Sequence, residues 1–303
     1  MNSQARRWVG WGLVWVVVAG LWLAPLAAGA APYGEDRSGS EGEGGPLRWS
    51  AGRAAGGAER AEGPARPDEV VLWNQPLSAV DWSTAVDQEF PDGPTYSSYL
   101  ADDFANSEPW SIRAIYVPGS GWNGFSTLFN ATALRWMVYA DCAGLPCGDP
   151  SGAGSPPVWS LALAPADPQV TITTGTGGYP SNTLVNLTTP FGLPSGQWWL
   201  IFYPTMVFDP YGQYGRQPSD TANGSIGQWI NPGGGFGGGT AWVGWDTLWP
   251  EPPYPYDVAF RLEGLAGLRV DSTGDGGDAN LTDGVCATSG GVCTLRAAIE
   301  QAN

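Results

Sequence analysis

Short runs of alternating apolar and polar residues follow one another from Val70 to about Gly264, and clusters of turn-forming residues separate them. A period of two is typical of half-buried strands, and no long amphipathic helix interrupts the series. The segments are EVVLWN, SYLADDF, WSIRAIYV, LRWMVYAD, PVWSLAL, QVTITT, TLVNLT, QWWLIFYP, IGQWIN, TAWVGWD and YDVAFRLEG. They predict an all-β sandwich over residues 69–265, and its size favours a jelly roll.

Several of these segments also indicate which face is buried. In YDVAFRLEG, alternation predicts that Val258, Phe260 and Leu262 point into the core. In LRWMVYAD, Leu134 and its alternate neighbours should be buried, and Arg135 with its alternates should be wetter. QWWLIFYP is apolar throughout, which fits either a central strand covered on both sides or a strand that offers an aromatic face to a partner. The Gly-rich NPGGGFGGGT predicts a flexible connection between strands, because no helix and no lysine accompany it.

The first 68 residues differ in character from the rest. Residues 1–30 have the form of an export signal, in which Arg6 and Arg7 precede a long apolar stretch and AGA at 28–30 offers a cleavage site. The apolar stretch is long enough for an uncleaved anchor, but the cleavage site favours removal. Residues 31–68 predict a disordered linker rich in Gly, Ala, Glu, Arg and Pro. We therefore expect an extracellular or cell-surface protein with no membrane contact beyond the cleaved signal.

Charge narrows the class of partner. The formal net charge is −16, all 13 basic residues are arginine, and the chain has no histidine. Removal of the two arginines of the signal would leave 11 basic residues against 29 acidic ones. Such a chain cannot neutralise many phosphates, so we expect no nucleic-acid partner. Without histidine, Ser-His-Asp and Cys-His mechanisms and His-ligated zinc sites are excluded within this chain.

Four cysteines form two local pairs, Cys142 with Cys147 and Cys286 with Cys293. In an exported protein this spacing predicts two disulfides, each closing a short loop and worth about 2 kcal/mol. A four-thiolate zinc site is the alternative. It is disfavoured because the pairs are far apart and neither has the two-residue gap of a zinc knuckle.

Aromatic residues suggest a ligand class. Thirteen tryptophans follow the signal, and aromatic rings stack on the apolar faces of sugars. Most of these rings are expected in the core, because Trp and Tyr are favoured in strands and bury large areas. The candidates for contact with a polysaccharide or other surface polymer therefore lie in predicted loops: Trp122, Asp209, Tyr211, Tyr214, Arg216, Trp245 and Trp249.

Carboxylates raise two further hypotheses. Asp102 and Asp103 adjoin each other in LADDF, after Glu89, but neighbours on a strand face opposite sides and cannot form a catalytic pair by themselves. We expect them to be surface or edge charges. Calcium is the one cofactor that the sequence suggests, and its candidate ligands are Asp271, Asp275, Asp278 and Asp283. The favoured alternative is that these aspartates belong to a solvated, turn-rich connection.

The last stretch, GVCTLRAAIEQAN, predicts a helix that Thr294 caps. Leu295, Ala298 and Ile299 would share one face of this helix. Arg296 lies four residues before Glu300. Residues 268–303 resemble the CSLREA domain, whose core is CTLRAA here, with Thr and Ala in place of Ser and Glu. In that family the module stands at the head of a right-handed parallel β-helix in exported bacterial surface proteins. The resemblance implies a cap for such a β-helix, which is expected downstream and is absent from this sequence.

The stretches ADDF, YAD and AFRLEG are similar, more weakly, to exported jelly-roll modules without an assigned activity. Taken together, these patterns predict a non-catalytic surface module that binds or adheres to glycan. One alternative is the accessory front end of a β-helix lyase or hydrolase whose catalytic part is missing. The other is a purely structural spacer.

Overall fold

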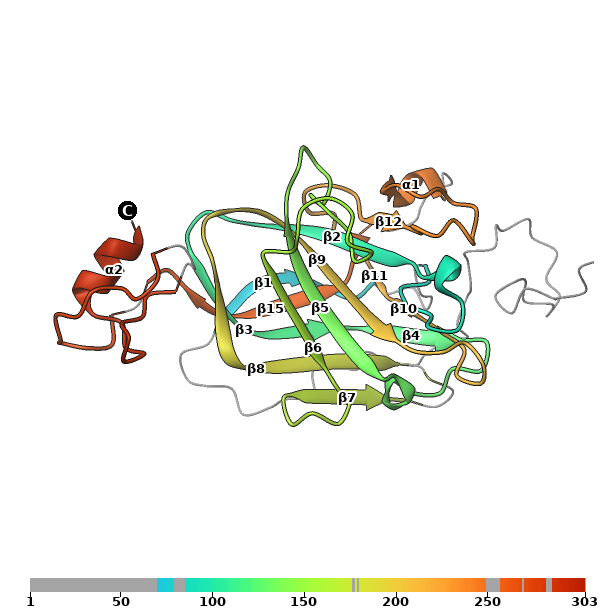
Figure 1. The fold of residues 1–303 in the computed structure, drawn as a ribbon, viewed down its shortest axis with the longest axis horizontal. Helices are drawn as coiled ribbons and strands as arrows, with labels where there is room; N and C mark the ends of the chain where they lie inside the picture. Colours follow the sequence, from blue (N-terminus) through green and yellow to red (C-terminus); the bar gives the residue numbers. More distant parts are fainter. Residues whose placement is uncertain are drawn as a thin grey trace, which may run out of the picture. The chain divides into compact units, whose positions relative to one another are not determined.

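The structure is a computed structural model that describes residues 70–78, 85–175, 178, 180–248, 257–268, 270–281 and 285–302. The predicted signal and linker, residues 1–30 and 31–68, lie outside these ranges. Strands and their connections make up most of the described chain up to residue 266 (Figure 1). Among the described residues, we find no helix with the length and apolar character that a membrane span requires.

The elements follow one another in a simple order. They are β1 Val70–Gln75, η1 Pro94–Tyr96, β2 Tyr99–Asn106, β3 Trp110–Val117, β4 Gly119–Trp122, η2 Leu128–Asn130, β5 Ala133–Ala140, β6 Trp159–Leu163, β7 Val170–Thr174, β8 Ser181–Leu193, β9 Gly196–Thr205, β10 Gln213–Arg216, β11 Pro218–Ser219, β12 Gln228–Ile230, β13 Val243–Gly244, α1 Trp245–Leu248, β14 Asp257–Val258, β15 Phe260–Ala266 and α2 Leu295–Ala302.

Two larger sheets carry the fold. One has the strand order β1-β15-β3-β8-β7 and the other has the order β13-β12-β2-β9-β5-β6, while β10 pairs with β4 and β11 with β14. Every strand pairing within these sheets is antiparallel. The main core combines side chains of β3, β8 and β15 with side chains of β2, β5 and β9. The prediction of an all-β sandwich is confirmed, and the jelly-roll form stays a prediction.

Alternation along the strands identified the core well. Phe260, Leu262, Leu134 and Trp136 are all buried, as their positions in the sequence predicted. Tyr139, expected on the wetter face of β5, is buried as well. The face of the six-stranded sheet that points away from the main core, called the outer face below, is therefore also covered over part of its area.

Strand β9 explains why the outer face needs a cover. It lies between β2 and β5 in the six-stranded sheet. Leu200 and Phe202 point into the main core, whereas Trp199 and Ile201 join a second apolar cluster on the outer face. All four side chains are fully buried. Of the two alternatives for QWWLIFYP, the central strand covered on both sides is confirmed.

The connection between β5 and β6, residues 141–158, is attached to this outer face. The indole Nε1 of Trp199 donates to Asp141 Oδ1 at 2.8 Å, and Trp242 Nε1 donates to the carbonyl of Gly148 at 3.2 Å. The Cys142–Cys147 disulfide closes the start of this connection. Both predicted disulfides are present, and the described chain contains no free cysteine.

The expectation that Asp102 and Asp103 are surface charges is wrong. Asp102 is 0% exposed and Asp103 is 7% exposed, and β2 is an interior strand between β12 and β9. Asp102 Oδ2 accepts a hydrogen bond of 2.7 Å from Gln75 Nε2. Nearby, Asp257 Oδ2 accepts a hydrogen bond of 2.7 Å from the Asn223 backbone N–H. Buried carboxylates of this kind persist because donors satisfy their oxygens.

Burial also shifts the protonation of these two acids. It raises the pKa of Asp102 well above its usual range, and the charge of Asp257 adds to the effect. Burial likewise raises the pKa of Asp257 to about 6. Desolvation disfavours the charged form of a carboxyl group, so both acids hold their protons to higher pH than an exposed aspartate does.

A pH dependence of stability follows. Between its unfolded pKa of about 4 and its folded pKa of about 6, Asp257 binds more protons in the folded state, so the free energy of unfolding falls as pH rises through this window. Asp257→Asn removes that titration, and we expect it to reduce the fall by on the order of 2 kcal/mol. Urea unfolding at several pH values from acid to neutral measures the slope.

The matched control is Asp275→Asn, because Asp275 is exposed and its ion pair with Arg296 lowers its pKa. That residue titrates below the window, so its substitution should leave the slope of the wild type unchanged. Equal slopes for Asp257→Asn and the wild type would contradict the assignment.

Candidate functional site

A pocket of about 380 Å³ opens on the outer face where β9 ends and where β2 and β5 begin. Polar and apolar groups share its lining. The polar side chains are Glu89, Ser97, Tyr99, Arg135, Ser151 and Thr205, and the remaining lining residues are Phe90, Pro91, Pro94, Pro232 and Gly233. Its volume falls within the range of small-molecule sites, and the mixture of convergent polar groups with apolar walls is typical of them.

The pairing register of the strands brings the residues at the base of this pocket side by side. Arg135 of β5 lies directly opposite Tyr203 of β9, and its neighbours Leu134 and Trp136 point into the main core. Alternation therefore directs the Arg135 side chain to the outer face. The ring of Tyr99 from β2 packs against the ring of Tyr203, with centroids 4.7 Å apart. A row of Tyr99, Tyr203 and Arg135 thus crosses three neighbouring strands.

A small polar network joins the floor to the segment before β2. Thr205 Oγ1 donates to Glu89 Oε2 at 2.6 Å, and Arg135 Nε donates to Thr205 Oγ1 at 3.0 Å. Arg135 Nε also lies 3.5 Å from Glu89 Oε2, and both side chains are about one third exposed, at 36% and 35%. Within the described part of the chain, the terminal nitrogens of Arg135 and Oε1 of Glu89 make no hydrogen bond. These groups are placed to meet a ligand.

Of the tyrosines on the outer face, Tyr99 lines the pocket, whereas Tyr203 and Tyr139 belong to the buried cluster beside it. Burial raises the pKa of Tyr99, and the carboxylates of Glu89 and Asp149 raise it further. Burial also raises the pKa of Tyr203 and raises that of Tyr139 to about 12. All three hydroxyls are therefore protonated at neutral pH, and a protonated hydroxyl can donate as well as accept.

The rim of the pocket is held by one buried amide. Asn231 Nδ2 donates to the carbonyls of Thr95 and Ser97, both at 2.9 Å, and Asn231 Oδ1 accepts from the Phe236 backbone N–H at 2.9 Å. The rings of Tyr96 and Phe236 meet edge to face at 5.3 Å. These contacts join the η1 turn to the Gly-rich connection between β12 and β13.

Close packing explains two glycines of that connection. A Cβ on Gly233 would lie 2.4 Å from Thr95 Cα, and one on Gly235 would lie 2.7 Å from the Thr95 carbonyl oxygen. The Gly235 backbone N–H also donates to that carbonyl at 2.8 Å. NPGGGFGGGT does connect strands, as predicted, but its first half is packed against the rim of the pocket.

The disulfide-bearing connection supplies one side of the pocket. Ser151 lines the pocket, and Asp149 Oδ1 accepts from its backbone N–H at 2.7 Å and from its hydroxyl. Asp141, at the start of the connection, accepts from the Gly144 backbone N–H at 3.1 Å. The position of Ser151 therefore depends on carboxylates that fold the connection on itself.

The structure places most of the predicted ligand residues elsewhere. Trp122, Tyr214, Arg216 and Trp245 are buried, at 6%, 0%, 0% and 2% exposed. Trp122 and Tyr214 belong to β4 and β10, which pair with each other and pack into the interior. Burial prevents these side chains from contacting a ligand in this state.

Arg216 illustrates the reason most clearly. Its Nε donates to Asp87 Oδ2 at 2.8 Å, and both side chains are fully buried. Of the other candidates, Asp209 is exposed and Tyr211 is partly buried, whereas Trp249 lies outside the described residues. None of the six candidates that the structure describes lines the 380 Å³ pocket.

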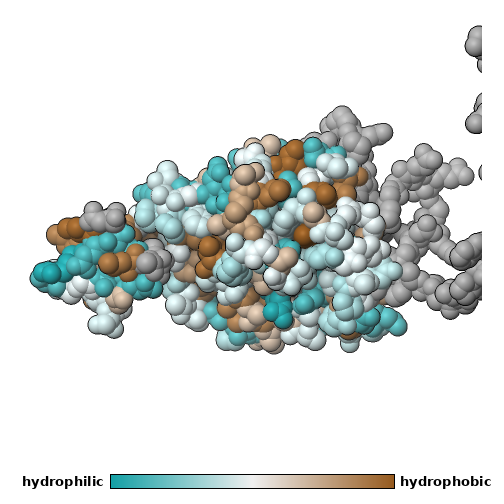
Figure 2. Space-filling view, turned by 45° about the horizontal axis from the view of Figure 1, so that its top comes forward, coloured by the Kyte–Doolittle hydropathy of each residue, from teal (hydrophilic) through white to brown (hydrophobic). Residues whose placement is uncertain are grey.

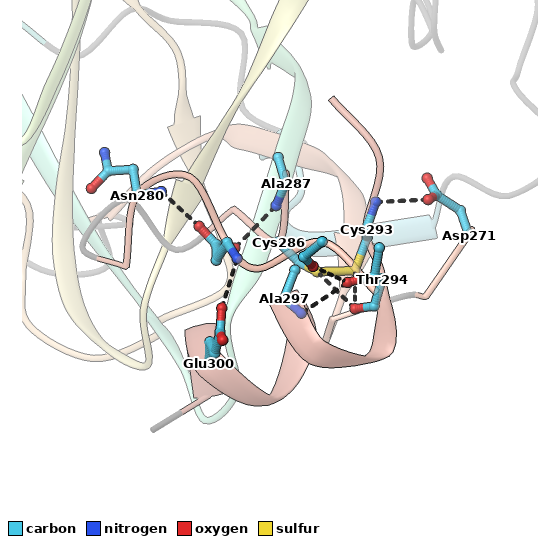
Figure 3. Close-up of a disulfide and its surroundings, with 10 residues drawn as sticks. Asp271, Asn280, Cys286, Ala287, Cys293, Thr294, Ala297 and Glu300 are labelled. Carbon is cyan, nitrogen blue, oxygen red and sulfur yellow. Dashed lines mark hydrogen bonds between the residues drawn. A yellow bond between two sulfur atoms is a disulfide. The ribbon is translucent and has the colours of Figure 1, made fainter. Parts of the chain in front are cut away.

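The three predicted calcium ligands that the structure describes have structural partners in the C-terminal segment, and Figure 3 shows Asp271 among them. Asp271 Oδ1 accepts from the Cys293 backbone N–H at 2.7 Å, and the carboxylate of Asp278 accepts from the backbone N–H groups of Asn280 and Ala287 at 2.8 and 3.1 Å. Asp275 pairs with Arg296, and Asp283 lies outside the described residues. Across the described chain, no three acidic or cysteine side chains gather in a way that suits a metal ion.

Helix α2 begins as the sequence predicted. Thr294 Oγ1 accepts from the Ala297 backbone N–H at 3.0 Å, so Thr294 caps the helix beside the Cys286–Cys293 disulfide (Figure 3). Leu295 and Ile299 of the predicted face are 63% and 54% exposed, and Ala297 is buried. The arginine of the helix, Arg296, pairs with Asp275 rather than with the glutamate four residues later.

The residues that line the pocket had only a weak signal in the sequence. Arg135 is the one charged residue inside the apolar run LRWMVYA, and alternation assigned it to the wetter face. Glu89 and Thr205 gave no such signal, because their meeting depends on a bridge between segments more than 100 residues apart. The sequence favours aromatic residues in predicted loops instead, and packing buries Trp122, Tyr214 and Trp245.

The packing of the rim generates a stability prediction. Gly233→Ala places a methyl group against the Thr95 backbone, and such overpacking costs about 1–3 kcal/mol. Gly290→Ala is the control, because the nearest atom to its added Cβ is Thr288 Oγ1 at 3.6 Å, and we expect a change within about 0.5 kcal/mol. Chemical denaturation compares the two. Equal free energies of unfolding for both variants would contradict the packed rim.

No protein-family model, curated protein or solved structure matches this chain. The resemblance of residues 268–303 to the CSLREA domain stays a sequence-based prediction. The case for a function therefore rests on the geometry of the pocket and on the chemistry of its lining.

Proposed function

We propose that this protein is a non-catalytic exported module that binds glycan at the cell surface through the pocket of Glu89, Tyr99 and Arg135. The observation that carries the proposal is the network of Glu89, Thr205 and Arg135, all of which line a partly apolar pocket, and which leaves one carboxylate oxygen and the terminal guanidinium nitrogens without a hydrogen bond in the described part of the chain. A ligand that suits this lining carries several hydroxyl groups on a ring with apolar faces. Sugars have that structure.

Binding rather than chemistry fits the acids of the pocket. Glycoside hydrolysis uses two carboxyl groups across the scissile bond. Of the described residues that line the pocket, Glu89 alone is acidic, and it is held by Thr205 and Arg135. We therefore assign Glu89 to ligand contact.

The two disulfides support the proposed export, and the acidic composition limits the class of partner. Disulfides persist in oxidising compartments, and both cysteine pairs are bonded. The strongly acidic composition disfavours polyanionic partners and leaves polysaccharide or another surface polymer as the proposed partner.

Substitution of Arg135 tests the pocket. Arg135→Met retains most of the apolar stem and removes the donors, so we expect affinity for a bound glycan to fall at least roughly tenfold. A glycan array identifies the ligand, and isothermal titration calorimetry measures the affinity. Arg296→Met is the matched control, since Arg296 lies on α2 and pairs with Asp275. Wild-type affinity in a folded Arg135→Met variant, or failure of the wild type to bind any glycan, would overturn the proposal.

A second function is favoured by the surface of the C-terminal segment. Leu295 and Ile299, one turn apart on α2, are 63% and 54% exposed, and apolar surface is visible in this segment at the left of Figure 2. We propose that this segment also heads a parallel β-helix, in an adhesin or in a carbohydrate-active enzyme. A capping helix with an apolar face suits the end of a solenoid, which otherwise exposes its core.

The coding sequence beyond codon 303 tests this second function directly. We expect in-frame solenoid repeats, and clustered Asp and Arg within them would favour an enzyme, whereas an anchor or sorting segment would favour adhesion. An immediate stop codon, or a continuation without repeats, would leave the segment as a spacer and contradict the β-helix.

A further inference from the structure

The lining of the pocket narrows the class of ligand. We infer that the pocket takes a neutral sugar unit through two adjacent hydroxyl groups and discriminates against uronates and other anionic sugars. This inference rests on the proposed glycan-binding function and makes it more specific. It rests on two features: the hydrogen-bond donors of Arg135 lie beside the acceptor oxygen of Glu89, and the electrostatic field around them is negative.

The donor and the acceptor are fixed side by side. Thr205 Oγ1 receives the Arg135 Nε–H at 3.0 Å and donates to Glu89 Oε2 at 2.6 Å, so it holds the two charged groups in contact. The terminal nitrogens of Arg135 and Oε1 of Glu89 keep their hydrogen-bonding capacity within the described part of the chain. Carboxylate oxygens only accept, and guanidinium nitrogens only donate.

This pair is complementary to a vicinal diol. One hydroxyl can donate to Glu89 Oε1 while its neighbour accepts from Arg135. A ligand carboxylate can use only the donors, and it would meet Glu89 at the same place. The geometry therefore favours a group that both donates and accepts over a group that only accepts.

The charges around the pocket also disfavour an anionic ligand. Arg135 is the only cation among the described lining residues, and its charge is balanced by Glu89 in contact with it. A second carboxylate, Asp149, lies near enough to add to the rise in the pKa of Tyr99 that burial begins. An anionic sugar would thus meet the Glu89 carboxylate beside the one guanidinium, with Asp149 hydrogen-bonded to the lining residue Ser151, on a chain whose net charge is −16.

The apolar side of the pocket does not depend on charge. Pro91, Pro94 and Pro232 also line the pocket. Such a wall can pack against the C–H groups of a sugar ring whether or not the ring carries a carboxylate. Selectivity between neutral and anionic sugars is therefore assigned to Glu89 and Arg135 rather than to the rim.

Matched polymers test the inference on the mature full-length protein. Polygalacturonate and alginate are compared with the neutral polymers made from them by chemical reduction of their carboxyl groups, alongside a panel of natural neutral glycans. We expect the neutral member of a pair, or a neutral glycan of the panel, to bind at least roughly tenfold more tightly than any anionic polymer. Glu89→Gln should raise the affinity for the anionic member relative to the neutral one. Asp275→Asn makes the same change of charge on the C-terminal segment and should leave that ratio unchanged.

The outcomes separate the two levels of the proposal. An anionic polymer that binds as tightly as the neutral polymers, or more tightly, overturns the selectivity and leaves glycan binding in place. An unchanged ratio in Glu89→Gln also overturns the role assigned to this carboxylate. Absence of binding to every polymer overturns the glycan-binding function itself and the selectivity with it.

Discussion

The need to bury both faces of one strand governs the architecture of this protein. Strand β9 carries large apolar side chains on alternate positions of both faces, and a single sandwich core can cover only one of them. The connection after β5, with its disulfide, and the side chain of Trp242 are attached to the other face through indole hydrogen bonds. Burial of aromatic area on this scale is worth several kcal/mol, which offsets the ordering of long connections.

The pocket arises where this second covering ends. Tyr99, Tyr203 and Arg135 continue the outer face, and there the described cover consists of the η1 turn with Pro94 and the preceding Pro91, the Gly-rich connection and Ser151. Asn231 fixes the first two of these to each other, and glycines at 233 and 235 allow their backbones to touch. A rigid sheet that positions side chains beneath loop-built walls is a common arrangement for binding sites.

The alternation of apolar and polar residues along the chain predicted the fold class, whereas the site depends on contacts between segments that are far apart in the sequence. Alternation along β5 and β15 identified the buried Trp136 and Phe260, and spacing identified both disulfides. The same pattern could not reveal that Tyr214 and Arg216 lie in a short strand paired with β4, so their Gly-rich surroundings suggested a surface loop. It also failed for Asp102, because a polar residue on an edge strand and one on an interior strand look alike in sequence.

Two arginine–carboxylate pairs differ in burial, and this difference indicates which pair serves the fold and which can contact a ligand. Arg216 and Asp87 are both 0% exposed, and removal of one partner from such a pair costs about 3–5 kcal/mol because it leaves an uncompensated charge. Burial raises the pKa of Asp87 to about 7 although Arg216 lowers it, which shows how strongly the interior opposes that charge. The pair of Arg135 and Glu89 is about one third exposed, and pairs of this kind contribute roughly 0–1 kcal/mol. The surrounding interior therefore holds the first pair together, whereas stability explains little of the second. Arg135 lines the pocket and is held by Thr205, and its position there is better explained by a ligand that it meets.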